Sequence, residues 1–362
     1  MPDFDPGDFF VTDYDACRED FVARAAQLAA DPRALRRFDI VDDALSGNLS
    51  CDALWLGAPD APRALVLMSG THGVEGYTGS AIQRYLLQQI ADGGLRLPPS
   101  LALLMVHSLN PWGMRWARRC DREGIDLNRN FCDFDALPPV TADREQVLLA
   151  LSLPGTNDCI KSLAALRREW GQWRFDIAVS EGQYDTPWAP FYGGRGPAAS
   201  RRAIDGCIDH WQLEQRELVV IDLHTGLGPW GYGELISDHP AGSKANDYAR
   251  NLFGPAVAVA EEGQSFSVPK RGLLDYRWHP LMAERGCFLT LEFGTLSTDS
   301  LFYTLLDEHR FWRDHSPQSA PVEYARHRRE MLQHFCPEDN LWRQGVLFRA
   351  WQVVRRVIGA AA

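Results

Sequence analysis

The sequence lacks an excess of basic residues. Of its 362 residues, 37 are Lys or Arg and 48 are Asp or Glu, which gives a formal net charge of −11 at pH 7. Binding to nucleic acid or to an anionic membrane surface requires cations that neutralise phosphate groups. The composition therefore argues against both kinds of partner.

Paired cysteines and long apolar runs are also missing. The eight cysteines form no C-x-x-C pair, a spacing typical of zinc knuckles and redox motifs. The longest clean apolar run, residues 101–106, is far shorter than the ~20 residues of a membrane helix. Five aspartates precede Arg18, and no apolar segment of a secretion signal accompanies them. We expect a reduced, cytoplasmic protein.

Short apolar runs recur along the chain, separated by helical or loop-like segments. The predicted strands cover residues 64–70, 101–107, 175–180, 218–224 and 287–293. Runs of this kind are typical of a mostly parallel or mixed sheet that is covered on both faces. We therefore predict an α/β fold with a mixed, mostly parallel central sheet and helices on both faces.

No shift in composition marks a domain boundary, so we expect a single domain over residues 1–362. The first 50 residues, with a helix predicted at 20–30, are expected to cover the sheet. Helices are also predicted at 79–90 and, as a closing element, at 340–362. Two long loops, at 110–131 and 180–200, are expected to be functional or mobile.

An imidazole and a carboxylate follow the first predicted strand, in the string Ser69-Gly-Thr-His72-Gly-Val-Glu75-Gly. A loop or a first helical turn can aim positions i and i+3 at one point, and both side chains are suitable zinc ligands. His72 and Glu75 are therefore candidate metal ligands. The alternative is that both are ordinary polar residues at a solvated loop end.

A second histidine ends the predicted strand at 218–224, in Ile-Asp222-Leu-His224-Thr-Gly-Leu-Gly. Ligands of open α/β sheets gather outside the carboxyl ends of the strands, where His72, Glu75 and His224 would all lie. Two histidines and a glutamate form the ligand set of catalytic zinc, with a fourth position left for water. The alternative for His224 is a core histidine bonded to a backbone carbonyl.

A glutamate lies among apolar neighbours in Phe288-Leu-Thr-Leu-Glu292-Phe-Gly-Thr. Burial raises the pKa of a carboxyl group, which suits a role in proton transfer. The alternative for Glu292 is an ion pair with one of the arginines, because buried acids are usually paired.

The loop at 110–131 contains five arginines: Arg115, Arg118, Arg119, Arg122 and Arg129. A guanidinium binds carboxylates through two hydrogen bonds and stabilises a developing oxyanion. The alternative is a solvated basic face. Tryptophans and apolar residues within the same loop favour packing against the protein, with some of the arginines directed inward.

The chain resembles the zinc carboxypeptidases and their relatives through four motifs between residues 72 and 295. These motifs are Thr-His72-Gly-Val-Glu75-Gly, Asp126-Leu-Asn128-Arg129-Asn-Phe131, Asp222-Leu-His224-Thr-Gly and Leu-Glu292-Phe-Gly-Thr. The likeness is greatest to a bacterial branch of unknown function, in which a Phe-Tyr-Gly-Gly loop accompanies the zinc motif. The resemblance implies a metallopeptidase fold and activity.

The resemblance also implies a role for each residue of the site. His72, Glu75 and His224 would bind one zinc ion per chain, and Glu292 would activate water. Asn128 and Arg129 would hold a substrate carboxylate, and Asp126 would orient His72. Arg119, nine residues before Asn128, would polarise the scissile carbonyl, with Arg118 as the second choice.

The substrate-capping tyrosine of the digestive carboxypeptidases has no clear counterpart. Tyr276, Tyr184, Tyr192 and Tyr232 all lie in candidate loops. We assign Tyr192 to the substrate site, because it belongs to the Phe-Tyr-Gly-Gly loop.

Three hypotheses follow for the function. The first is a zinc-dependent hydrolase that cleaves an amide or peptide bond next to a free carboxylate in a small peptide or modified amino acid. The second is a deacylase of N-acyl amino acids, which would resemble aspartoacylase and succinylglutamate desuccinylase. The third is a pseudoenzyme that binds zinc or peptide without catalysis. The sequence leaves the oligomeric state open.

Overall fold

The computed structural model describes residues 5–43, 45–265, 267–282 and 284–362. Its strands are β1 (Leu35–Asp43), β2 (Gly47–Leu56), β3 (Arg63–Ser69), β4 (Leu101–His107), β5 (Glu217–Gly226), β6 (Gly233–Ser237), β7 (Val257–Val259) and β8 (Gly286–Gly294). Its α-helices are α1 (Tyr14–Leu28), α2 (Gly76–Ala91), α3 (Pro111–Arg115), α4 (Ala142–Leu151), α5 (Thr156–Trp170), α6 (Gln172–Ser180), α7 (Arg201–His210), α8 (Lys244–Phe253), α9 (His279–Met282), α10 (Thr298–Asp314), α11 (Pro321–Phe335) and α12 (Asn340–Ala361).

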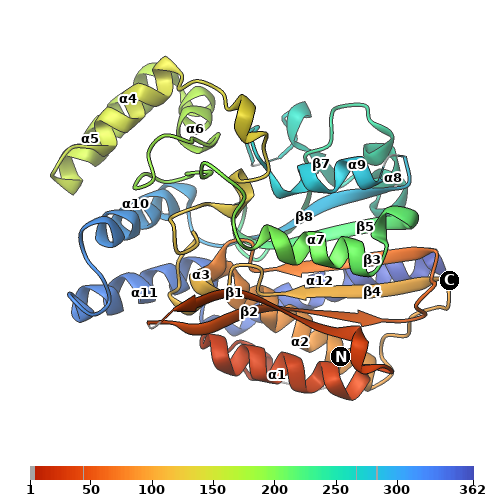
Figure 1. The fold of residues 1–362 in the computed structure, drawn as a ribbon. Coiled ribbons are helices and arrows are strands. Elements are labelled where there is room, and N and C mark those ends of the chain that lie inside the picture. Colours follow the sequence, from red (N-terminus) through yellow and green to blue (C-terminus); the bar gives the residue numbers. More distant parts are fainter. Residues whose placement is uncertain (1–4, 44, 266, 283) are drawn as a thin grey trace.

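The strands form one mixed sheet in the order β1-β2-β4-β3-β5-β8-β6-β7 (Figure 1). Four of its seven neighbouring pairs are parallel, including the central run β4-β3-β5-β8. The predicted α/β class with a mixed, mostly parallel sheet is confirmed.

A hydrophobic core covers each face of the sheet. Along β5, Val219, Ile221 and Leu223 join one core, whereas Leu218 and Val220 join the other. This alternation follows from the two-residue period of a strand. The first core includes side chains of α1, α2, α8 and α12, and the second includes those of α7 and α9. Helices therefore lie on both faces, as predicted.

The strands predicted at 64–70, 101–107, 218–224 and 287–293 correspond to β3, β4, β5 and β8. The helices predicted at 79–90 and 340–362 correspond to α2 and α12. The first helix begins earlier than predicted, at Tyr14, because the Asp13 carboxylate accepts a hydrogen bond from the Ala16 N–H and caps it.

The strand predicted at 175–180 is wrong, because these residues lie in α6. Phe175, Ala178 and Val179 are its buried residues, and their i, i+3, i+4 spacing marks one face of a helix. A short apolar run fits a strand and a buried helix equally well.

The first 50 residues contribute more than a helical cover. Residues 35–43 and 47–56 form β1 and β2, which pair antiparallel and extend the sheet beyond β4. The side chains of β1 are exposed or only partly buried, which explains why its sequence contains no apolar run. Residues 1–4 and 44 of this segment lie outside the described residues.

Helices α4, α5 and α6 stand away from the sheet beside α10 (Figure 1). They follow the predicted loop at 110–131, which contains α3 and the short 3-10 helix η4 (Leu127–Arg129). Residues of α5 and α6 line one wall of the cavity described below.

Candidate metal centre and its cavity

Three candidate site residues come from the carboxyl ends of neighbouring parallel strands. His72 follows β3 and precedes the 3-10 helix η3 (Gly73–Glu75), which leads into α2. His224 lies near the end of β5, and its register partner on β8 is Glu292. Parallel strands place their carboxyl ends at one edge of the sheet, so residues distant in sequence meet there.

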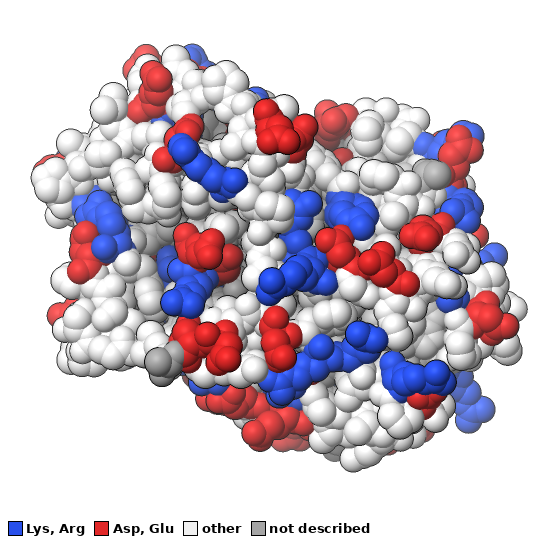
Figure 2. Space-filling view, viewed as in Figure 1, with Lys and Arg blue, Asp and Glu red and all other residues white. Residues whose placement is uncertain are grey.

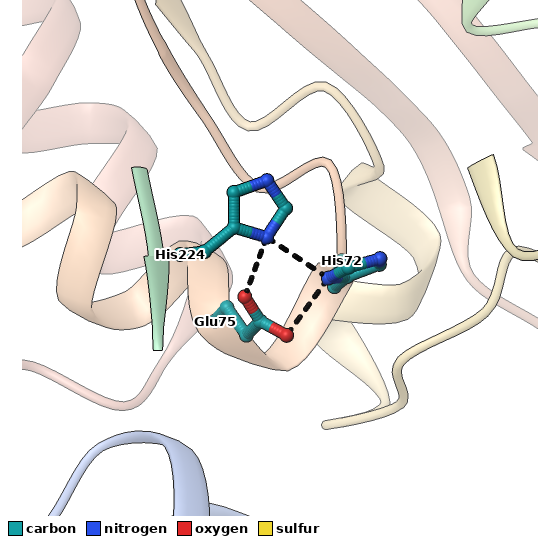
Figure 3. A group of neighbouring side chains, drawn as sticks. All are labelled: His72, Glu75 and His224. Carbon is teal, nitrogen blue, oxygen red and sulfur yellow. Dashed lines mark hydrogen bonds and ion pairs between the residues drawn. The ribbon is translucent and has the colours of Figure 1, made fainter. Parts of the chain in front are cut away.

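His72, Glu75 and His224 are buried, and their ligand atoms lie within 4.8 Å of one another (Figure 3). His72 Nδ1 is 2.8 Å from Glu75 Oε1, and His224 Nδ1 is 3.0 Å from Glu75 Oε2. The two Nδ1 atoms are 3.1 Å apart. Two nitrogens bound to one tetrahedral zinc ion at the usual distance of about 2.0–2.1 Å would be about 3.3 Å apart. The donor set therefore fits a zinc ion in both chemistry and spacing.

Two further carboxylates orient the histidines. His72 Nε2 lies 3.2 Å from Asp126 Oδ1, and His224 Nε2 lies 2.7 Å from Asp222 Oδ2. If each Nε2–H donates to its carboxylate, each Nδ1 presents a lone pair to the centre of the group. This is the protonation pattern that metal-binding histidines need.

The pKa shifts of Glu75 and His224 show that the group favours an ionised carboxylate next to a positive charge. Burial favours the neutral acid, but the histidines outweigh it and hold the pKa of Glu75 well below its usual range. Burial likewise disfavours charged His224, but Asp222 and Glu75 raise its pKa.

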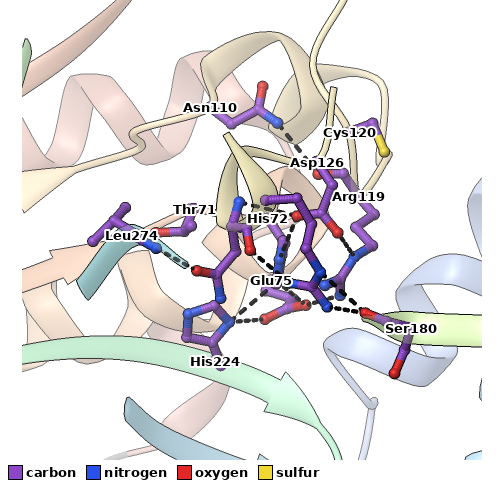
Figure 4. Close-up of polar contacts among 12 residues, drawn as sticks. Thr71, His72, Glu75, Asn110, Arg119, Cys120, Asp126, Ser180, His224 and Leu274 are labelled. Atoms are coloured by element: carbon purple, nitrogen blue, oxygen red, sulfur yellow. Dashed lines mark hydrogen bonds and ion pairs between the residues drawn. The ribbon is translucent and has the colours of Figure 1, made fainter. Parts of the chain in front are cut away.

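Arg119 lies beside the candidate ligands. The backbone N–H of Gly73 donates to the Arg119 carbonyl at 3.1 Å, and a Cβ atom on Gly73 would lie 2.1 Å from the Gly113 carbonyl carbon. This close approach, which only glycine allows, places Arg119 Nη1 3.4 Å from Glu75 and its Nε 2.9 Å from Asp126 (Figure 4).

Arg118, the second choice for this position, points away from the site. Its guanidinium forms a buried ion pair with Glu308 of α10 and packs over the ring of Trp312 at 4.7 Å. Sequence spacing cannot decide which of two adjacent arginines reaches the site. In the structure the two side chains point in different directions, and Arg119 is the one beside the candidate ligands.

We expect Arg118→Met to lower the free energy of unfolding by about 3–5 kcal/mol, because it leaves Glu308 buried with only His309 beside it. Urea unfolding measures the loss. A second variant, Arg118→Met/Glu308→Met, should recover most of it, and equal losses in both variants would contradict this account.

The ion pair also predicts a dependence on pH. Burial raises the pKa of Glu308, but Arg118 and His309 together outweigh it and lower the pKa to about 2. The pair therefore stabilises the fold fully above the unfolded glutamate pKa of about 4.3, and its contribution is lost as the pH falls from there toward 2.

Asn128 and Arg129 both line the cavity. Arg129 is buried, and its guanidinium donates to the backbone carbonyls of Ser180 and Asn128, at 2.8 and 2.6 Å. It forms no ion pair with any acid in the described ranges. A buried guanidinium held by neutral groups keeps N–H donors and a positive charge for an anion.

Tyr192, which we assigned to the substrate site, does not line the cavity. Its side chain belongs to the core on the α7 face, together with Ile125, Leu127 and Phe131. Its neighbour Phe191 lines the cavity instead and packs against Arg119 and Arg129, with ring distances of 5.4 and 5.5 Å. Adjacent residues of this loop face opposite sides.

The other candidate tyrosines also differ in their surroundings. Tyr184 donates a hydrogen bond to the Arg129 carbonyl at 2.9 Å and is buried. Tyr276 is partly exposed and donates to the Lys270 carbonyl at 3.1 Å. Tyr232 is exposed and is not among the residues that line the cavity.

Glu292 faces the cavity from β8 without an ion pair to any described residue. Its Oε1 accepts a hydrogen bond from the Leu227 N–H at 3.0 Å. Burial and the nearby Glu75 carboxylate raise the pKa of Glu292 to about 7. The ion pair considered as an alternative is therefore not observed, and the carboxyl group is suited to exchange protons near neutral pH.

Sequence reasoning missed several residues of the cavity. Asp238, directly after β6, and Lys270 both line it. Asp238 follows a short apolar segment that we did not recognise as a strand, and no pattern marked Lys270. One wall is apolar and comes from α5, α6 and α10: Leu163, Phe175, Val179, Leu301, Phe302 and Leu305.

A second cluster with metal-ligand chemistry is formed by Asp307, His327 and Glu330. Arg326 Nη1 lies 3.0 Å from Asp307 and 2.9 Å from Glu330. A guanidinium therefore already occupies the position of a cation between the two acids.

Acidic and basic side chains are intermixed on the face shown in Figure 2. Among the described residues, no helix is both long enough and apolar enough to cross a membrane.

The fold and the site together define an α/β protein with a buried His-Glu-His candidate metal centre at the carboxyl ends of parallel strands. The chain belongs to the family described as protein of unknown function (DUF2817), whose model matches residues 10–349. The predicted bacterial branch is thereby confirmed.

The chain is also similar to solved structures at low sequence identity. Bovine thrombin-activatable fibrinolysis inhibitor, in complex with tick carboxypeptidase inhibitor, is 14% identical with a TM-score of 0.45, over 95% of this chain and 97% of that one. Murein-tripeptide amidase MpaA from Escherichia coli O157 is 19% identical with a TM-score of 0.36, over 80% and 96%. An aspartoacylase family protein from Mesorhizobium loti is 15% identical with a TM-score of 0.39, over 76% and 65%. No curated protein matches the chain.

Proposed function

We propose that the protein is a zinc-dependent hydrolase that cleaves an amide or peptide bond next to a free carboxylate. The observation that carries this proposal is the convergence of His72, Glu75 and His224 on one point, with Glu292 facing the same cavity. A structural zinc site is usually closed by a fourth protein ligand, whereas a catalytic site keeps one position open.

His72, Glu75 and His224 would hold one zinc ion per chain, with Asp126 and Asp222 fixing the two imidazole rings. When bound, zinc lowers the pKa of water and polarises a carbonyl oxygen. Glu292 would take a proton from the attacking water and deliver it to the leaving amine, because it faces the cavity without an ion pair to any described residue. A bound dication would lower the pKa of Glu292 by favouring its ionised form.

The arginines would bind and polarise the substrate. Arg129, with the side-chain amide of Asn128, would hold the carboxylate, because the Arg129 guanidinium lacks an acidic partner. Arg119 would polarise the scissile carbonyl from its position beside Glu75. Asp126 would hold Arg119 in place through the hydrogen bond to its Nε.

A deacylase of N-acyl amino acids is the second candidate, and the apolar wall formed by α5, α6 and α10 favours it. An acyl chain could pack against this wall while its carbonyl lies at the metal centre. The carboxylate subsite and the proton transfer would be unchanged.

A product analysis on one panel separates these candidates. Zinc-loaded protein is incubated with dipeptides, N-acyl amino acids and the carboxyl-amidated form of each, and the products are identified by mass spectrometry. We expect cleavage of free-carboxylate compounds only. Cleavage of dipeptides would identify a peptidase, and cleavage of N-acyl amino acids would identify a deacylase. If the zinc-loaded protein cleaves no compound, the result would support a binding protein instead.

We expect Arg129→Ala mainly to raise KM and Arg119→Ala mainly to lower kcat. Loss of Arg129 weakens ground-state and transition-state binding alike, whereas loss of Arg119 removes an interaction that strengthens as negative charge develops on the carbonyl oxygen. An effect of about 10²–10³-fold on kcat is typical for loss of such a donor. Steady-state kinetics on a cleaved panel compound measures the split, and negligible effects of both variants would contradict it.

A further inference from the structure

Four Arg or Lys side chains of the described residues line the cavity, and only two of these four have acidic partners. Arg119 pairs with Asp126, and Arg167 pairs with Asp299 at 2.6 Å. Arg129 and Lys270 form no ion pair within the described ranges of the chain. The cavity therefore contains two cations that the protein itself leaves uncompensated.

Lys270 is held in place by neutral groups. Its Nζ donates to Ser267 Oγ and, at 2.9 Å, to the Val268 carbonyl. An ammonium group has three donors, so one remains for another partner. Lys270 is thus fixed without being neutralised.

The loop that carries Lys270 is fastened to the segment that carries Arg129. The Phe131 N–H donates to the Gly272 carbonyl at 3.0 Å, and Asn128 Oδ1 accepts from the Leu274 N–H at 2.8 Å. Gly272 has a φ of +65°, and a Cβ atom there would lie 2.2 Å from the Arg129 carbonyl oxygen. Only glycine permits this contact, which keeps Lys270 close to Arg129.

Arg129 is buried and Lys270 is half-buried, and two cations that line one cavity repel each other. Burial and the nearby Arg129 guanidinium lower the pKa of Lys270 to about 8. Asp238 and Glu292 favour its charged form, but neither makes an ion pair with it, and burial raises the pKa of both acids. An anion bound between the two cations would relieve this repulsion.

We propose that Lys270 acts together with Arg129 as a second cationic anchor for the substrate carboxylate. Arg129 offers a planar fork and Lys270 a point charge, so the two together select a carboxylate over a neutral amide. This inference rests on the proposed function, because the carboxylate is that of the compound to be cleaved or of its amino acid product.

The test uses L-alanine and L-alaninamide, which differ only in the carboxylate, with the zinc-loaded full chain. Calorimetry should show that the protein prefers L-alanine, and Lys270→Met should weaken L-alanine binding about 10–100-fold without changing that of the amide. Lys270→Arg should retain the preference. Lys244→Met, which removes an exposed lysine paired with Glu284, should behave as wild type.

A second measurement needs no variant, because the chain contains three lysines, at 161, 244 and 270. Saturating L-alanine should protect Lys270 from reductive methylation, measured by peptide mass spectrometry, while Lys161 and Lys244 remain reactive as internal controls. L-Alaninamide should not protect Lys270.

Equal weakening of both ligands by Lys270→Met would indicate a structural role and overturn the proposal. Unchanged binding of L-alanine, or wild-type protein that does not prefer it over the amide, would overturn it as well. Failure of the proposed function would give a different result. If the protein binds L-alanine through Lys270 but cleaves no panel compound, the role of Lys270 is supported and the proposed hydrolase activity is contradicted.

Discussion

Glu292→Gln is expected to lower kcat by about 10²–10⁴-fold while zinc remains bound. Glutamine preserves the shape of the side chain but cannot accept the proton. Glu292 faces the cavity and is not one of the three converging ligands, so its loss should not release the metal. Steady-state kinetics, elemental analysis and melting temperature on one preparation measure the three quantities.

The stability of this variant separates catalysis from a structural role. Burial and Glu75 raise the pKa of Glu292, so the ionised carboxylate opposes folding above the ordinary glutamate pKa. Metal-free Glu292→Gln should therefore melt no lower than metal-free wild type near pH 8. An ion pair that supports the fold would give the opposite result.

A matched control lies on the neighbouring strand β6. Glu234 is the register partner of Glu292 on β6, is buried, and is not among the residues that line the cavity. Glu234→Gln removes the same charge nearby and should retain most of the turnover. A zinc-replete Glu292→Gln protein with near wild-type kcat would eliminate Glu292 as the proton acceptor.

His72→Ala and His224→Ala are expected to reduce bound zinc to well below one ion per chain and activity to the uncatalysed level. Each substitution removes one of three ligands from a site where the remaining two cannot close around the metal. Elemental analysis after dialysis measures the stoichiometry, and circular dichroism checks the fold. His210→Ala, at an exposed histidine of α7, is the control.

The orienting carboxylates should give an intermediate result. Asp222→Asn and Asp126→Asn leave the ligands in place but replace the charged acceptors of the His224 and His72 N–H groups with neutral amides. Loss of such partners typically weakens metal affinity by about 10–100-fold. Full zinc retention by folded His72→Ala and His224→Ala proteins would show that the metal binds elsewhere.

The sequence predicts the strand-end residues of the site better than its loops. His72, Glu75, His224 and Glu292 each follow or end an apolar run, and the rule that parallel strands end at one edge brings them together. The common location of these four residues can be predicted once the strands and their directions are known.

The loop residues could not be predicted in the same way, because their directions depend on tertiary contacts. Arg118 and Arg119 are adjacent, yet one pairs with Glu308 and the other with Asp126. Tyr192 and Phe191 likewise face opposite sides of their loop. Nothing in the local sequence determines which member of each pair reaches the cavity.

β1 and α6 were not predicted correctly from the sequence, each for a different physical reason. β1 is half exposed at the edge of the sheet and lacks an apolar run. α6 contains an apolar run whose burial against neighbouring helices follows a helical period. Short segments of either kind take their structure from their surroundings.

The most direct test of the central claim is a zinc titration of metal-stripped protein, with hydrolysis of a cleaved panel compound followed throughout. The account predicts no turnover before zinc is added, a linear rise, and a break at one zinc ion per chain. His224→Ala should show no rise over the same range. Full hydrolysis by the stripped protein, or an equal rise in the His224→Ala protein, would contradict the proposal that a zinc ion held by His72, Glu75 and His224 carries out the reaction.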